Sequence, residues 1–112
     1  MADDEHVYGE VDNEGDLRQI FAGIRRDVAQ ATTREELTKL YRRAEYLITL
    51  TYSPAWQKKF GLKIDALRQV AEEEFTATAR AINARAVDVG TDPDYDETWG
   101  RSQAARSGSS RR

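Results

Sequence analysis

The sequence predicts an all-α protein, a small three-helix bundle with a long C-terminal helix and disordered charged tails. Apolar residues recur at helical spacing in three stretches between residues 16 and 89. Capping and helix-breaking residues separate the stretches. Both ends of the chain are rich in charge and poor in aliphatic side chains, so they cannot bury enough surface to offset chain entropy. At 112 residues the chain has room for one small domain.

The first helix is expected over residues 16–31, where apolar side chains form one narrow stripe. Asn13 or Asp16 can cap its start. The second helix is expected over 33–52, because Thr33 and Glu36 have the spacing of a capping box. Apolar residues surround the axis near its end, which predicts burial on several sides. A strand over 46–52 is the alternative, since Ile, Thr and Tyr favour strands.

An elbow follows the second helix. Ser53 and Pro54 end that helix, because the residue before a proline avoids helical dihedral angles. The same pair can cap and start a short helical turn through Lys59, and Gly61 then breaks the chain.

The third helix is expected over residues 63–89, with one apolar stripe along its whole length and Gly90 at its C-terminal end. Its second half is rich in alanine, and small side chains allow another helix to approach closely. The first two helices are each shorter by about a third, so we expect the third to overhang them. The overhang predicts a homo-oligomer that self-associates through Ala79, Ile82 and Ala86.

Charge divides the chain into blocks. Residues 1–16 hold seven acidic and no basic side chains, and residues 101–112 hold four arginines and no acid. We therefore expect an acidic disordered tail over 1–13, a helical domain over 14–90, and an acidic linker with an Arg/Ser-rich disordered tail over 91–112. The net charge of −3 argues against a simple polyanion-binding protein.

The residues that carry most enzyme chemistry are scarce. The chain has no cysteine, and its one histidine, His6, lies in the acidic tail. Asp92, Asp94 and Asp96 follow the first half of a calcium loop, but Glu97 replaces the required glycine and Gln103 the bidentate glutamate. No nucleotide-binding motif follows a predicted strand. We expect no enzyme activity, no cofactor and no metal.

No apolar run approaches the ~20 residues of a membrane span, and the acidic start does not resemble a signal peptide. We therefore expect a cytoplasmic protein without membrane contact. Chains of this size and helical character also include phage and mobile-element accessory proteins, although only size supports that analogy.

The leading functional hypothesis is a non-enzymatic protein–protein interaction module, such as an adaptor, inhibitor or assembly subunit. The predicted partner site is the elbow, where two aromatic rings and two lysines share a short turn. Its residues are Trp56, Lys58, Lys59 and Phe60. Alternatively, Trp56 and Phe60 fold back and plug the end of the bundle.

The second hypothesis is a small nucleic-acid-associated subunit that uses the basic body and the arginine-rich tail. Its candidate residues are Arg25, Arg26, Arg42, Arg43, Arg111 and Arg112.

Overall fold

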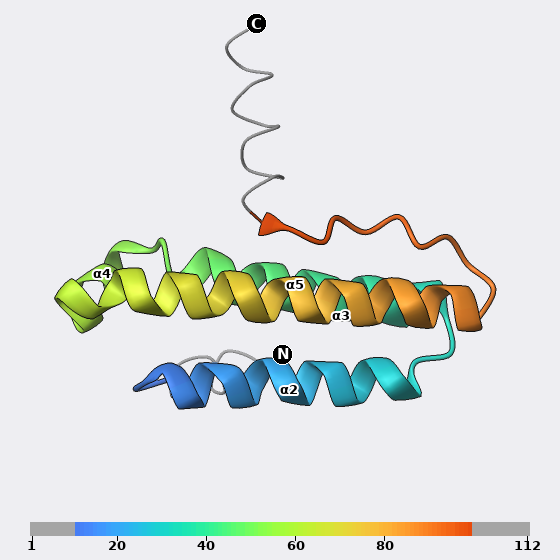
Figure 1. The fold of residues 1–112 in the computed structure, drawn as a ribbon, viewed down its shortest axis with the longest axis horizontal. Helices are drawn as coiled ribbons and strands as arrows, with labels where there is room; N and C mark the ends of the chain where they lie inside the picture. Colours follow the sequence, from blue (N-terminus) through green and yellow to red (C-terminus); the bar gives the residue numbers. More distant parts are fainter. Residues whose placement is uncertain (1–10, 100–112) are drawn as a thin grey trace, which may run out of the picture.

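Three long helices lie side by side in the computed structural model, which describes residues 11–99 (Figure 1). They are α2 (Glu14–Gln30), α3 (Arg34–Leu50) and α5 (Ile64–Asp88). A short helix, α4 (Pro54–Phe60), and a 3₁₀ turn, η1 (Gly61–Lys63), connect α3 to α5. The predicted three-helix bundle is confirmed. The strand alternative over 46–52 is wrong, because α3 continues through Leu50.

Local capping fixes where the helices begin. The Asn13 side chain accepts a hydrogen bond from the backbone N–H of Asp16 at 2.9 Å. Thr33 and Glu36 form the predicted capping box at the start of α3. The Ser53 hydroxyl accepts from the backbone N–H of Trp56 at 3.2 Å, and Pro54 occupies the first turn of α4. Each cap satisfies a backbone donor that has no partner within its helix.

The core lies between α5 and the two shorter helices, since α5 packs against both α2 and α3. The largest fully buried side chains come from all three helices and include Phe21, Leu37, Leu47, Phe75 and Ile82. Within residues 11–99 no helix combines the length and the apolar character that a membrane span needs.

A Schellman motif ends α5 and reverses the chain. The backbone N–H of Thr91 donates to Ala86 O at 2.8 Å, and the N–H of Gly90 donates to Val87 O at 3.1 Å. Gly90 has a φ of +83°, which a glycine adopts at little cost. Residues 91–99, here called the strap, then run back over α3 and α5 on the side opposite α2 (Figure 1).

The strap corrects the expected boundary at residue 90. We expected an acidic linker there, but the buried side chain of Trp99 joins the core. The described fold therefore extends at least to residue 99. The predicted tails over 1–10 and 100–112 lie outside the described residues.

Candidate functional site

The elbow is built around a buried tryptophan. Trp56 is only 8% exposed and belongs to the core, and the half-buried ring of Phe60 meets it edge-on at 5.3 Å. This arrangement is the end-plug alternative. The partner-contact role predicted for Trp56 is wrong to that extent, because a ring buried in its own core offers little surface to a second protein.

The two elbow lysines differ in what they contact. Lys59 donates to the carbonyl oxygen of Val11 at 2.8 Å and lies 3.3 Å from a carboxylate oxygen of Asp12. It therefore ties the elbow to the residues that precede α2. Lys58 is exposed. The fully exposed side chain of Leu62 stands next to them in η1, and the sequence analysis did not single it out.

The predicted self-association face is wrong. Ala79, Ile82 and Ala86 have no exposed surface within a single chain. The close approach that their small side chains allow is used by the chain's own helices. The overhang does not form because α2, α3 and the strap together cover the apolar stripe of α5.

The candidate nucleic-acid residues are partly neutralised by carboxylates. Arg25 donates to Glu74 Oε1 at 2.9 Å and to the Thr78 hydroxyl at 3.1 Å. Arg43 lies 3.8 Å from Asp27. The other two candidates on the folded body, Arg26 and Arg42, are exposed. Arg111 and Arg112 lie outside the described residues.

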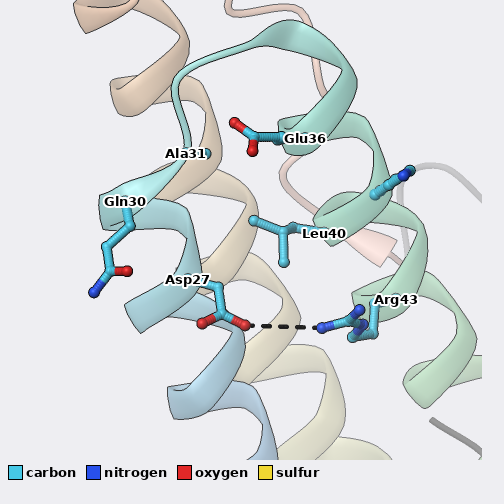
Figure 2. A pocket seen from close by; sticks show the side chains of 7 residues that line it. Asp27, Gln30, Ala31, Glu36, Leu40 and Arg43 are labelled. Carbon is cyan, nitrogen blue, oxygen red and sulfur yellow. Dashed lines mark ion pairs between the residues drawn. The ribbon is translucent and has the colours of Figure 1, made fainter. Parts of the chain in front are cut away.

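An open hollow of about 410 Å³ lies between the end of α2 and the first turns of α3 (Figure 2). The ion pair between Asp27 and Arg43 crosses it. The Glu36 carboxylate accepts hydrogen bonds from Thr32 and Thr33 as part of the capping box. Chiefly the bond from the Thr32 backbone holds the pKa of Glu36 below its usual value. A carboxylate stabilised in its charged form is a weak base. No group of metal-ligating side chains forms among residues 11–99.

The richest set of polar contacts surrounds the strap. On α3, Arg34 and Tyr41 lie on one helix face and reach strap carbonyl groups. Arg34 Nη1 donates to Asp92 O at 2.8 Å, and the Tyr41 hydroxyl donates to Asp96 O at 3.1 Å. Both bonds end on main-chain atoms, so they do not depend on the identity of the strap side chains.

Asn83 of α5 clamps the strap from the other side. Its Nδ2 donates to Tyr95 O at 2.9 Å, and its Oδ1 accepts from the backbone N–H of Tyr95 at 3.0 Å. The same Nδ2 donates to Glu97 Oε2 at 3.0 Å. Asn83 is only 8% exposed. A side-chain amide carries one donor group and one acceptor group, which match the N–H and C=O of a single residue in extended conformation.

Two aromatic side chains anchor the strap. The Tyr95 ring lies 4.9 Å from the ring of Tyr41, and its hydroxyl is 2.7 Å from the Thr38 hydroxyl. Trp99 is 5% exposed and meets Phe75 edge-on at 5.9 Å between ring centroids. These contacts fix the strap at its centre and at its end.

Opposite charges line the rim of the same groove. Arg34 Nη2 donates to Asp94 Oδ1 at 2.8 Å, and this bond raises the pKa of the Arg34 guanidinium above its usual value. Arg80 of α5 lies 3.5 Å from Glu97. We name the surface under the strap the strap groove, formed by Arg34, Thr38, Tyr41, Phe75, Arg80 and Asn83.

The sequence analysis missed the strap groove. One signal was present, because Tyr95 and Trp99 stand four residues apart in a segment otherwise interpreted as an acidic linker. Large aromatic side chains are uncommon in segments that stay solvated. Asn83 gave no signal of its own within the alanine-rich half of the third helix.

Comparison with family models, characterised proteins and solved structures finds no match to this chain. The functional argument therefore rests on the contacts of its own residues.

Proposed function

We propose that this chain is a non-enzymatic protein-interaction module that binds a segment of extended polypeptide in the strap groove. The observation that supports it best is the set of four hydrogen bonds from side chains of α3 and α5 to main-chain atoms of the strap. Hydrogen bonds to a peptide backbone supply affinity for any extended chain, and side-chain pockets supply specificity.

The position of Asn83 strengthens the argument. A buried amide costs free energy unless its donors and acceptor are all satisfied. Here both strap main-chain groups of Tyr95 complete it. The groove is thus complementary to a polypeptide backbone, a feature that helix-to-helix packing does not require.

The nucleic-acid hypothesis has weaker support. Arg25 and Arg43 face carboxylates of the same chain, so a phosphate would have to compete with Glu74 and Asp27. Only Arg26 and Arg42 remain exposed among the candidate residues of the body. Counterion release makes such binding fall steeply with salt, which separates it from an interaction through hydrogen bonds and aromatic rings.

The test selects displayed random peptides on the full-length chain carrying Tyr95→Ala, which removes the central anchor of the strap and opens the groove. Peptides of about 12 residues are long enough to span the strap at ~3.3 Å per residue. We expect the selected peptides to lose binding when Asn83→Ala is added. They should keep it when Arg42→Ala is added, because Arg42 is exposed and forms no part of the groove.

The same variants test the second hypothesis. A labelled oligonucleotide that binds with a steep salt dependence and is weakened by Arg42→Ala, but not by Asn83→Ala, would favour nucleic-acid association. Selected peptides that ignore Asn83→Ala, or a selection that yields none, would contradict the proposed function.

A further inference from the structure

We propose that the strap groove takes an acidic partner peptide with two aromatic residues four positions apart, and that the strap is an internal competitor for this site. This inference rests on the proposed function and adds to it the chemistry of the partner and the regulation of the groove. The strap itself defines the ligand, because its side chains already fill each pocket.

The preference for acidic residues comes from two cations on facing helices. Arg34 of α3 takes the Asp94 carboxylate at 2.8 Å, and Arg80 of α5 takes Glu97 at 3.5 Å. These two strap carboxylates lie on either side of Tyr95 in the sequence. A peptide with acidic residues flanking its first aromatic residue would repeat both ion pairs.

The preference for aromatic residues comes from two separate contacts. The first aromatic position is enclosed by the Tyr41 ring at 4.9 Å and by the Arg34 guanidinium, which lies 4.8 Å from the Tyr95 ring centroid. The second position meets the edge of Phe75. Because the Asn83 clamp fixes the main chain at the first position, it also sets the register of the second.

The strap is suited to displacement. Its residues 92–98 form no helix and no strand, so leaving the groove breaks no hydrogen-bond ladder of its own. The Asp94 and Arg34 side chains of its rim ion pair are both substantially exposed, and such pairs contribute little to binding. Gly90 provides a pivot where the strap leaves α5.

Tethering sets the threshold for a partner. A short linker holds the strap at an effective concentration in the millimolar range, so a free peptide with the same contacts binds weakly while the strap is docked. The apparent affinity falls with the fraction of molecules whose groove is open. A change that loosens the strap without altering the groove must therefore tighten binding of a peptide in trans.

The experiment uses the full-length chain and a fluorescently labelled synthetic peptide with the sequence of residues 91–99. Fluorescence anisotropy compares the unchanged protein with Asp94→Lys, which turns the Arg34 ion pair into a repulsion within the strap only. We expect the variant to bind the peptide at least about fivefold more tightly. Asp88→Lys makes the same charge change at an exposed site on α5 outside the groove and should have no effect.

Two further measurements identify the site. The strap and the peptide use the same Asn83 contacts, so substituting Asn83 affects both and the effects cancel while the strap is docked. The substitution is therefore added to Asp94→Lys, where we expect Asn83→Ala to weaken peptide binding by about tenfold or more. If Asp94→Lys fails to fold by circular dichroism, Tyr95→Phe replaces it, because it loses only the Thr38 contact.

Each contrary result has a distinct meaning. Equal binding by the unchanged protein and the loosened variants overturns the competitor role of the strap. Equal binding of a peptide with Asn and Gln in place of its acids, or with Ala in place of its aromatic residues, overturns the partner chemistry but leaves the proposed function standing. A loosened variant that dimerises through its own strap identifies a second copy as the occupant and overturns an external partner. Absence of peptide binding to every variant contradicts the proposed function as well.

Discussion

Trp99 at the end of the strap meets Phe75 of α5 edge-on, with 5.9 Å between the ring centroids and an angle of 74° between the planes. Aromatic pairs of this geometry contribute beyond the area that they bury. The contact joins a core residue of the bundle to a segment that arrives from the far end of α5. It therefore measures how firmly the strap is bound.

The two tryptophans should differ in their contribution to stability. Trp56→Ala removes an end plug that nothing can replace and should cost about 3–5 kcal/mol. Trp99→Ala should cost less, about 1–3 kcal/mol, because the loss cannot exceed the free energy of docking the strap. Chemical denaturation of both variants checks this. Equal losses in one cooperative transition would mean that the strap is an inseparable part of the core.

Glu74 should contribute more to stability than its neighbour Glu73. Its carboxylate is 13% exposed and accepts from Arg18 and Arg25, each at 2.9 Å. Glu73 is 57% exposed and lies 3.7 Å from Arg18. We expect Glu74→Gln to cost about 1–2 kcal/mol, since both arginines remain partly in water. The matched Glu73→Gln should change stability by less than about 0.5 kcal/mol in the same denaturation experiment.

The capping box at α3 should make stability depend on pH. Hydrogen bonds, chiefly from the Thr32 backbone, lower the pKa of Glu36 in the folded state below its usual 4.5. Its contribution is therefore present above pH 4.5 and is lost as the pH falls through the folded-state pKa. Glu36→Gln keeps a capping side chain without the charge. Thermal unfolding from pH 7 to acid should show the gap between wild type and variant shrinking, and a constant gap would contradict this account.

Leu62 should be dispensable for folding. Its side chain is fully exposed on η1, whereas Leu67 on the next turn of the chain is 2% exposed. Leu62→Ala should change stability by less than about 0.5 kcal/mol. Leu67→Ala should cost about 2–5 kcal/mol. If Leu62→Ala destabilised the monomer by a comparable amount, the side chain would have to be packed rather than exposed.

The alanine-rich half of α5 should respond to overpacking within one chain. Ala79→Leu inserts a larger side chain into a site with no exposed surface and should cost about 1–3 kcal/mol. Ala77→Leu, at an exposed position of the same helix, is the control. The loss at Ala79 should not depend on protein concentration. A loss that changed with concentration would instead indicate an interface between copies.

The sequence predicts the helices well because their signals are local. The Thr33–Glu36 capping box, the Ser53 cap and the Gly90 terminus each act within a few residues, and the structure contains all three. The plug alternative for Trp56 also followed from short spacing in the chain.

The strap groove could not be predicted in the same way, because its contacts are distant in sequence. Arg34 and Asp92 are 58 residues apart, and Tyr41 and Asp96 are 55 apart. Composition alone made residues 91–99 resemble a linker, since their carboxylates outnumber their apolar side chains. The error at Ala79 has the same origin, because helix lengths alone did not reveal that the strap helps to cover α5.

The Schellman turn at Gly90 also sets the order in which the molecule assembles. The strap contacts side chains of α3 and α5 at once, so its groove exists only after those two helices have paired. Contacts of such large sequence separation carry the greatest loop-closure cost and form late in folding. Docking of the strap is therefore the closing step of folding and the opening step of unfolding. A nascent chain presents its groove empty until the residues beyond Gly90 have been synthesised.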